Sequence, residues 1–459
     1  MKNNLIASIL FLIFSNTAFA NVTLPNVISD NMVLQRNTEV TIWGWANPQE
    51  EVVISPSWNN LSYKIKASNQ AKWEINIPTP KEGGPFSISI KGYNEIVLKN
   101  ILIGEVWICS GQSNMEMNAS WGIDNGDEAI KNATNPNIRF FTVPKLTATT
   151  PQNNLFGNWT ECTPETMKYF SSVGYFFAKR LQEDLKNVPI GLISSNWGGT
   201  PAEIWMPEEV IQNDVVLLEA AKTRREETYG PNQPGRAFNA MIYPLTGFKI
   251  AGVLWYQGES NVGSTVYDRT FSALITSWRK LWKSDFPFYF VQIAPYKYGE
   301  NHFGGAIIRD AQRKVLQEVS NTGMVVTSDI SPIDDIHPKD KKSVGTRLAN
   351  LALANTYKSN TALVNGPLYK GMNIDKNKVV VSFDFAEGLH FSNTKSNQFE
   401  IAGADGIFYE AVASIKKNNV ILQSDKIRNP VKVRYSWKNT DQSNLFNKAN
   451  LPASSFITK

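Results

Sequence analysis

Hydrophobic and polar positions follow two different patterns along this 459-residue chain. From residue 21 to about 98, short segments such as "KWEINIP" and "FSISIKGY" alternate apolar and polar residues at a period of two. Clusters of Asn, Pro and Gly separate these segments. Such alternation is typical of strands with one buried face. The sequence therefore predicts an antiparallel β-sandwich over residues 21–98, which we interpret as an accessory domain.

The pattern changes after Ile101, where continuous apolar runs alternate with amphipathic helical stretches such as "YDRTFSALITSWRKLWK". The runs include "EVWIC", "PIGLISS", "AGVLWY", "FPFYFVQIA" and "GMVVTSD". An apolar run without alternation indicates a strand buried on both faces. We therefore predict an α/β domain over residues 99–364, with a parallel sheet between two helical layers. Alternating strands such as "KVVVSFDF" return afterwards and predict a β-rich region over residues 365–459.

In a parallel sheet of this kind, the ligand lies at the carboxyl ends of the strands. The loops that follow the predicted strands therefore limit the search for a site. They are residues 110–118, 195–206, 257–264, 294–305 and 329–340.

The first twenty residues, "MKNNLIASILFLIFSNTAFA", form a separate element. Lys2, an apolar run over residues 5–14 and a small-x-small motif at 18–20 are typical of a secretory signal peptide. The run is too short to span a bilayer, and no cysteine follows Ala20 to carry a lipid. We expect export to the periplasm or secretion, and no later segment is apolar for long enough to be a membrane span.

Composition narrows the classes of function. With 42% hydrophobic and 19% charged residues, the chain is that of a globular protein, which excludes disorder on the scale of a domain. The net charge of +5 is mild, and no cluster of Lys and Arg alternates with aromatic residues. Nucleic acid is therefore not expected as a partner. A weak positive balance would suit an anionic sugar.

The two cysteines, Cys109 and Cys162, could form a disulfide in an exported protein. The preferred interpretation is one buried thiol at a strand end and another thiol in a loop. Two cysteines and three histidines are too few and too scattered for a metal site, so no metal is expected.

The segment "WICSGQSNMEMN" follows the first buried strand and contains two serines, Ser110 and Ser113. Ser110 comes directly after the apolar run and could still belong to the strand. Ser113 follows Gly111 and Gln112, where the chain can turn, and precedes an expected helix start. Ser113 is therefore the better candidate nucleophile. Because Met115 stands where a G-x-S-x-G elbow has its second glycine, an α/β-hydrolase fold is disfavoured.

A serine hydroxyl needs a base to become a nucleophile, and the chain offers three histidines. His337, in "ISPIDDIHPKDK", lies in one of the five loops and is the candidate base. His302 could line the cleft. His390 falls in the C-terminal β-rich region and is expected to be structural.

The imidazole of a catalytic histidine is usually oriented by an acid or a carbonyl group. Asp334 precedes His337 by three residues, a spacing that lets its carboxylate turn back onto the ring within one loop. Asp335 is the alternative orienter, and Asp329 is a more distant one. A local backbone carbonyl would also serve.

Two further loops offer donors for the oxyanion of an acyl-transfer reaction. In "SSNWGGTPAEIW", the pair Gly198 and Gly199 lets the backbone approach a ligand closely, and "WYQGESN" offers the amides of Gln257 and Asn261. Each pattern alone is more typical of a tight turn, but two such loops at the ends of neighbouring strands favour the functional interpretation. Glu259 is interpreted as a buried hydrogen-bonding residue that supports its loop, without a chemical role.

These four segments resemble the SGNH hydrolase superfamily and, within it, the sialate O-acetylesterase family. "VWICSGQSNMEM" is similar to the nucleophile block, "NWGGTPAEIW" to the glycine block, "LWYQGESN" to the third block and "DDIHPKDK" to the histidine block. The tail "NLFNKANLPASSF" and the N-terminal β region extend the resemblance over nearly the whole mature chain. The resemblance implies a three-layer domain with a flavodoxin-like parallel sheet.

The resemblance also implies catalytic roles. Ser113 would be the nucleophile and His337 the general base. Asp334 would orient the imidazole, with Asp335 as the alternative.

The implied oxyanion hole consists of the Ser113 backbone amide, Gly198 or Gly199, and an amide of the third block. The third block of the superfamily usually places an Asn two residues after a Gly, whereas this chain has "QGESN". Gln257 is therefore favoured, with Asn261 as the alternative.

The expected function is that of a carbohydrate O-acetylesterase which releases acetate from 9-O-acetylated sialic acid through a serine acyl-enzyme. Acetylated xylan is the alternative substrate for the same machinery. A rival of another class is a non-catalytic glycan-binding protein, in which the β regions and aromatic residues bind sugar. The chemistry needs neither a metal nor an organic cofactor, and the oligomeric state stays open.

Overall fold

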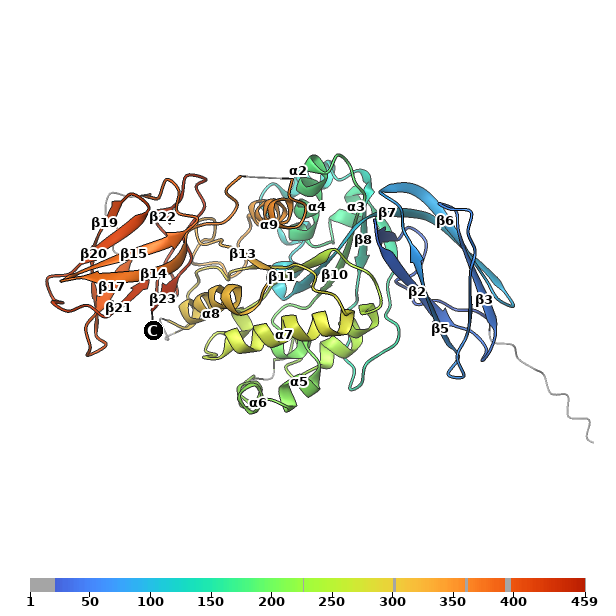
Figure 1. Ribbon diagram of the computed structural model, residues 1–459, viewed down its shortest axis with the longest axis horizontal. Helices are drawn as coiled ribbons and strands as arrows, with labels where there is room; N and C mark the ends of the chain where they lie inside the picture. The colour runs from blue at the N-terminus through green and yellow to red at the C-terminus, as the bar shows by residue number, and fades with distance from the viewer. Residues whose placement is uncertain (1–20, 226, 300–302, 360–361, 393–397, 459) are drawn as a thin grey trace, which may run out of the picture.

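Three parts lie in a row in the computed structural model of the chain: a β-rich N-terminal part, a central α/β part and a β-rich C-terminal part (Figure 1). The predicted fold class is therefore confirmed. The predicted signal peptide and His302 lie outside the described residues. The structure describes residues 21–225, 227–299, 303–359, 362–392 and 398–458.

The central sheet has six parallel strands and one antiparallel edge strand, in the order β13-β12-β11-β7-β10-β8-β9. The chain leaves β7 to build one side of the sheet and then returns to build the other. Such a reversal opens a crevice at the carboxyl ends of the strands. The strands are β7 (Glu95–Gly111), β8 (Asn135–Thr142), β9 (Trp159–Cys162), β10 (Ile190–Asn196), β11 (Gly252–Tyr256), β12 (Phe288–Val291) and β13 (Thr322–Val325).

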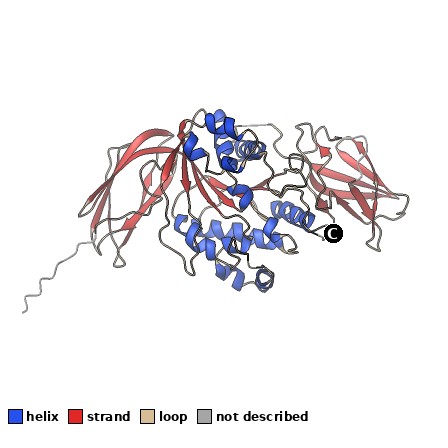
Figure 2. Ribbon diagram, turned by 180° about the vertical axis from the view of Figure 1, so that it is seen from behind, coloured by secondary structure: helices blue, strands red, loops and turns tan. Residues whose placement is uncertain are grey.

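Helices cover both faces of this sheet (Figure 2). One layer contains α4 (Ser172–Asp184) and α9 (Lys341–Asn355), which pack on each other. The other contains α7 (Tyr267–Trp282) and α8 (Gly304–Glu318). These four helices coincide with predicted helical stretches. The shorter helices are α1 (Ser113–Glu116), α2 (Gly126–Lys131), α3 (Pro164–Met167), α5 (Glu208–Gln212) and α6 (Val215–Lys222).

Strand β11 shows why the central strands are unbroken apolar runs in the sequence. Val253 and Trp255 pack in one core cluster together with Phe271 of α7. Leu254 and Tyr256 pack in the other cluster, beneath α4 and α9. Because successive side chains of a strand point to opposite faces, a strand covered on both sides needs an apolar residue at every position.

The N-terminal part consists of two groups of strands that share a core cluster. Its strands are β1 (Val33–Gln35), β2 (Glu39–Trp45), β3 (Glu51–Pro56), β4 (Tyr63–Lys66), β5 (Lys72–Pro78) and β6 (Gly83–Lys91). Strand β7 pairs with β6 over its first half and with β10 and β11 over its second half. The boundary predicted between residues 98 and 99 therefore falls within one continuous strand, which joins the N-terminal part rigidly to the central sheet.

The C-terminal part has its own core, formed by two four-stranded antiparallel sheets and the two-stranded sheet of β16 and β22. Arg309 of α8 fixes this part to the central domain, because its buried guanidinium donates to the carbonyl groups of Ser436, Lys438 and Asn439. The strands are β14 (Leu368–Asp375), β15 (Lys378–Asp384), β16 (His390–Phe391), β17 (Phe399–Ala402), β18 (Phe408–Glu410), β19 (Val412–Lys416), β20 (Asn419–Gln423), β21 (Lys432–Tyr435), β22 (Leu445–Phe446) and β23 (Phe456–Ile457).

Some features differ from the sequence patterns or go beyond them. Strand β8, "NPNIRFFT", was not predicted, because its Asn-Pro-Asn start is typical of a turn and Arg139 interrupts the apolar run. The guanidinium of Arg139 is buried and is held by the carbonyl group of Pro136 and by Glu161. Cys109 and Cys162 are both free, buried thiols. In the part of the chain that the structure describes, none of the helices has the length and hydrophobicity needed to cross a bilayer.

Candidate active site

Ser113 is the first residue of α1, just beyond the carboxyl end of β7. The turn between strand and helix depends on Gly111, which has a φ of +132°. A Cβ atom at Gly111 would lie 2.2 Å from the carbonyl oxygen of Tyr256, so no other residue fits there. Ser110, by contrast, is fully buried inside β7, and its hydroxyl group has no hydrogen-bond partner within the described residues.

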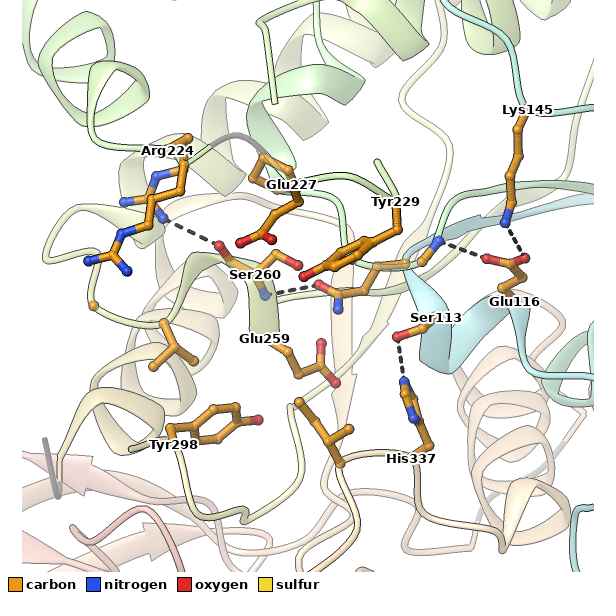
Figure 3. A pocket seen from close by; sticks show the side chains of 18 of the residues that line it. Ser113, Glu116, Lys145, Arg224, Glu227, Tyr229, Glu259, Ser260, Tyr298 and His337 are labelled. Atoms are coloured by element: carbon orange, nitrogen blue, oxygen red, sulfur yellow. Dashed lines mark hydrogen bonds and ion pairs between the residues drawn. The ribbon is translucent and has the colours of Figure 1, made fainter. Parts of the chain in front are cut away.

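His337 meets Ser113 across the sheet edge, with its Nε2 atom 2.8 Å from Ser113 Oγ (Figure 3). The two residues follow β7 and β13, whose carboxyl ends lie at the same edge. The rings of Trp121 and His337 pack in a T-shaped arrangement, with centroids 6.3 Å apart. The separation of 2.8 Å is within the range for proton transfer between a hydroxyl group and a base.

The surroundings of His337 favour its neutral form. Burial, followed by the positive charge of Lys341, lowers the pKa of the imidazole below its ordinary value. The carboxylates of Asp335 and Glu116 act in the opposite direction. A neutral imidazole has a lone pair that can accept a proton, so this environment suits a general base.

The three candidate orienting acids have different partners. Asp334 pairs with Lys297 in solvent, where its side chain is 73% exposed, and Asp329 pairs with Arg347. Asp335 Oδ1 accepts a hydrogen bond of 2.8 Å from the backbone N–H of His337. Asp335, the alternative orienter, is therefore the acid that contacts His337, and the contact is with its backbone.

A cavity of about 960 Å³ opens beside Ser113 and His337. All five loops selected from the sequence contribute to its wall. Each loop contributes a lining residue, and these residues are Gln112, Gly198, Glu259, Tyr298 and His337. The loops that follow five strands therefore meet in one pocket, as expected at the carboxyl edge of a parallel sheet.

Gly198 lies against Ser113, but its N–H group is already engaged. A Cβ atom at Gly198 would lie 3.1 Å from Ser113 Cβ, so a larger residue here would require Ser113 or its neighbours to shift. The Gly198 N–H donates to Glu116 Oε2 at 2.7 Å, and Lys145 Nζ pairs with Glu116 Oε1 at 2.6 Å (Figure 3). This amide can bind an oxyanion only if the carboxylate of Glu116 moves away. Gly199, with a φ of +73°, lies beneath the ring of Tyr229.

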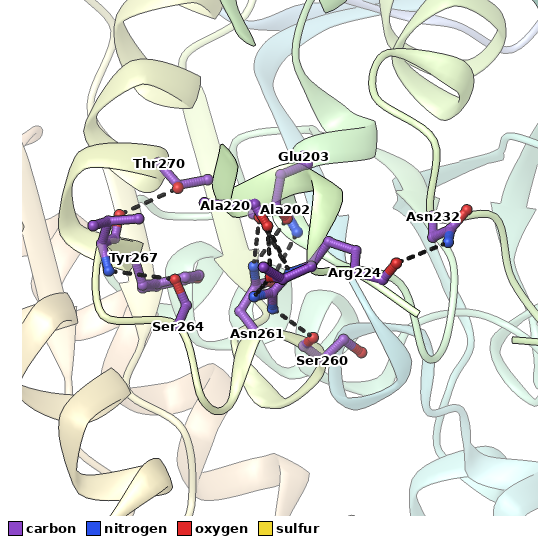
Figure 4. A network of polar contacts seen from close by, with 12 residues as sticks. Ala202, Glu203, Ala220, Arg224, Asn232, Ser260, Asn261, Ser264, Tyr267 and Thr270 are labelled. Carbon is purple, nitrogen blue, oxygen red and sulfur yellow. Dashed lines mark hydrogen bonds and ion pairs between the residues drawn. The ribbon is translucent and has the colours of Figure 1, made fainter. Parts of the chain in front are cut away.

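The structure does not bring Gln257 to the cavity, contrary to its predicted role. Gln257 Nε2 donates to the carbonyl group of Thr200 and to Asn261 Oδ1, while Oε1 accepts from the hydroxyl group of Tyr267. Asn261, the alternative, donates through Nδ2 to the carboxylate of Glu203 (Figure 4). Both side chains are 0% exposed, and neither lines the cavity. Their amides stabilise the loop from inside.

Gln112 is the amide that does line the cavity, directly before Ser113. Its Oε1 atom accepts hydrogen bonds from the backbone N–H groups of Gly258 and Ser260, at 3.3 and 3.2 Å. These two bonds fix the orientation of the amide. Sequence reasoning treated Gln112 only as a turn residue, although an amide next to the candidate nucleophile was the signal available.

Cationic and aromatic side chains complete the wall of the cavity. Lys145 is paired with Glu116, and Arg224 lies 3.7 Å from the buried carboxylate of Glu203. Arg224 is at the far end of the view from Ser113 and His337 (Figure 3). Arg225 also lines the cavity and is exposed. Trp121 and Tyr229 are exposed aromatic residues at the same cavity.

The remaining histidine within the described residues is remote from this site. His390 lies in β16 of the C-terminal part, with its Nδ1 atom 3.0 Å from the carbonyl oxygen of Gly388. It is not among the cavity residues. Among the described residues, no group of three His, Cys, Asp or Glu side chains is arranged to hold a metal ion.

Comparisons with known proteins identify the family of the central part. Residues 103–354, which include Ser113 and His337, match the family model of carbohydrate esterases described as sialic acid-specific acetylesterases. The chain belongs to this family. The match covers more than half of the chain and spans the central sheet from β7 to α9.

This carbohydrate esterase is similar along most of its length to proteins named as acetylesterases. It is 29% identical to the sialate O-acetylesterase of Homo sapiens, over 82% of this chain and 79% of the relative. It is 28% identical to that of Pongo abelii, over 89% and 86%. A crystal structure of a carbohydrate acetylesterase from Xanthomonas citri is 34% identical, with a TM-score of 0.87 over 95% of this chain and 99% of the other.

Proposed function

We propose that this carbohydrate esterase removes O-acetyl groups from sialic acid by a two-step serine mechanism. The observation that carries the proposal is the 2.8 Å contact between Ser113 Oγ and His337 Nε2. A serine hydroxyl group becomes a nucleophile when a neutral base at hydrogen-bond distance takes its proton. The lowered pKa of His337 supports its role as that base.

In the first step, His337 Nε2 takes the proton of Ser113 Oγ as the oxygen attacks the carbonyl carbon of the acetyl ester. The carbonyl electron pair moves onto oxygen and gives a tetrahedral oxyanion. When this intermediate collapses, the bond to the sugar oxygen breaks, and His337 returns the proton to that oxygen. The deacetylated sugar leaves, and Ser113 carries the acetyl group.

In the second step, His337 removes a proton from water, which attacks the acetyl carbon. Collapse of the second intermediate releases acetate and restores the hydroxyl group of Ser113. Of the two acids expected to orient His337, the contacts favour Asp335, which holds the loop through the His337 backbone. Asp334, paired with Lys297 in solvent, has the weaker case.

The oxyanion requires N–H donors that face the cavity. We assign this role to the Ser113 backbone amide and to Gln112 Nε2. The Ser113 N–H has no acceptor within its own helix, because it begins the first turn. Gln112 Oε1 is already held by two backbone N–H groups, so its Nε2 end is the one left to donate. The Gly198 amide would join after Glu116 releases it.

Arg225 offers a cationic contact for an acidic sugar, and sialic acid carries a carboxylate, while the lining also includes the carboxylate of Glu227. Lys145 and Arg224 already have carboxylate partners. Within the described residues, Arg225 forms no ion pair, although it lines the cavity. The sialate O-acetylesterases among the relatives support the same choice. A neutral acetylated sugar, such as a xylan fragment, would gain little from this arginine.

The test compares acetate release from 9-O-acetylated sialic acid and from acetylated xylo-oligosaccharide, using the wild-type protein and Ser113→Ala. We expect a higher kcat/KM on the acidic sugar and a loss on the order of 10⁴-fold or more in Ser113→Ala. Near wild-type turnover by Ser113→Ala would contradict the mechanism. Preference for the xylo-oligosaccharide would contradict the substrate assignment. Sugar binding by the wild type without any acetate release would indicate a glycan-binding protein.

A further inference from the structure

A buried polar cluster lies behind Ser113 and His337. It consists of Asn114 in α1, Lys341 at the start of α9 and Glu259 in η5 (Glu259–Asn261), with exposures of 0%, 1% and 8%. Burial of an amide, an ammonium and a carboxyl group costs free energy unless they bond to one another. Their contacts therefore show what the cluster holds together.

The side chain of Asn114 bonds to three other segments of the chain. Its Nδ2 atom donates to Glu259 Oε1 at 2.6 Å and to the carbonyl group of Ile336 at 2.9 Å. Its Oδ1 atom accepts from Lys341 Nζ at 2.6 Å. Asn114 follows Ser113, and Ile336 precedes His337. The residue after the nucleophile is therefore bonded to the residue before the base.

We infer that Asn114, Lys341 and Glu259 form a positioning unit that holds the loops of Ser113 and His337 at proton-transfer distance. The inference rests on the proposed serine mechanism and goes beyond it. Asn114 and Lys341 do not line the cavity, so they act through Ser113 and His337. A displacement of about 1 Å between reacting groups can cost on the order of a hundredfold in rate. Loss of the unit should therefore appear in kcat.

The unit also has an electrostatic effect on the base. Burial lowers the pKa of Lys341 to about 7, although the negative charges of Glu259, Asp335 and Asp340 act to raise it. Burial also raises the pKa of Glu259. When Lys341 is protonated, its charge lowers the pKa of His337. Its removal should raise the pKa of His337, an effect that a purely structural role would not produce.

Asn114→Ala removes all three side-chain bonds and is the main test. With a small aryl acetate as substrate, we expect kcat to fall by about tenfold to a hundredfold. KM should stay within about twofold, because the small substrate does not reach Asn114. Each rate is divided by the concentration of folded protein. The folded fraction is obtained from a thermal unfolding curve followed by circular dichroism.

Asn447→Ala is the matched control. Asn447 is also 0% exposed, and its Nδ2 atom donates to the carbonyl groups of Asn365 and Phe385 in the C-terminal part. Its replacement should lower the melting temperature and leave kcat per folded protein unchanged. An equal fall in kcat for both variants would show a general loss of stability and overturn the inference.

Lys341→Met and Glu259→Gln separate charge from hydrogen bonding. In Lys341→Met, the acidic limb of the kcat/KM profile should move to higher pH. Glu259→Gln keeps an oxygen that can accept from Asn114 but removes the charge, so it should lower kcat less than Asn114→Ala does. If Asn114→Ala does not fold, Lys341→Met decides, because it removes the bond to Asn114 Oδ1. An unchanged kcat together with an unmoved acidic limb in the folded variant overturns the inference.

Failure of the inference and failure of the mechanism give different results. Unchanged kcat in Asn114→Ala together with an inactive Ser113→Ala overturns the positioning unit alone. An active Ser113→Ala overturns the serine mechanism itself, whatever Asn114→Ala does.

Discussion

Two loops at the carboxyl edge of the sheet differ in how their polar groups are used. The loop after β7 carries Gln112 and Ser113 at the cavity, where Ser113 Oγ has His337 as its partner. The loop after β11 carries Gln257 and Asn261, whose amides bond to other buried groups. A group whose hydrogen bonds are complete inside the protein stabilises the fold, whereas one that faces solvent is available to a substrate.

The contrast is sharper because the two loops have nearly the same residue types. Residues 111–114 are "GQSN" and residues 257–261 are "QGESN". The second loop is covered by α7, from which Tyr267 reaches Gln257, and by η2 (Ala202–Trp205), from which Glu203 reaches Asn261. The first loop lies under the open cavity. Both loops contribute to the cavity wall, and the covering elements, not the residue types, decide which side-chain amides face the cavity and which are buried.

The largest effect that tests this contrast is expected on the cavity side. Gln112→Ala removes the proposed oxyanion donor and should lower kcat by about a hundredfold to a thousandfold. Initial rates of acetate release would measure it, with KM and the melting temperature recorded for the same preparation. An unchanged kcat would mean that the Gln112 amide does not bind the oxyanion.

The matching change on the buried side is Gln257→Ala. It leaves the hydroxyl group of Tyr267 and the carbonyl group of Thr200 without this partner, and should lower the free energy of unfolding by about 1–3 kcal/mol. Chemical denaturation would measure the loss. The kcat of the folded protein should fall much less than in Gln112→Ala. A large loss of kcat at normal stability would restore Gln257 as an oxyanion donor and break the contrast.

A smaller effect is expected at the rim of the cavity. Arg225→Gln should raise KM for acetylated sialic acid by a few-fold, since an exposed ion pair contributes up to about 1 kcal/mol. The rate on a neutral aryl acetate should not change. Arg428→Gln, an exposed arginine of the C-terminal part, is the control for the change in net charge. Equal effects of both variants on the acidic sugar would argue against a contact with Arg225.

The smallest expected effect is the pH dependence of kcat/KM that His337 produces. Burial and the charge of Lys341 place the pKa of His337 below 6.5, so the acidic limb of kcat/KM should have its midpoint below that pH. The unfolded chain binds this proton more readily than the folded chain, so stability from this group falls as pH drops below about 6.5. A pH–rate profile on the aryl acetate measures the limb, and a midpoint above 6.5 would contradict the assignment.

The sequence by itself indicated five strands and the four long helices of the central part, the two core faces of those strands, and the pair Ser113 and His337. These features depend on local periodicity and on the rule that parallel strands end at one edge. Export stays a prediction from residues 1–20.

Only the tertiary structure decided which acid contacts His337, that Glu116 holds the Gly198 amide, and that Gln112 rather than Gln257 faces the cavity. It also showed that β7 runs through the predicted domain boundary. The physical reason is that the use of a polar group depends on the partners that folding brings to it. Those partners come from distant segments such as η2, α7 and α9, and no local pattern in the sequence records them.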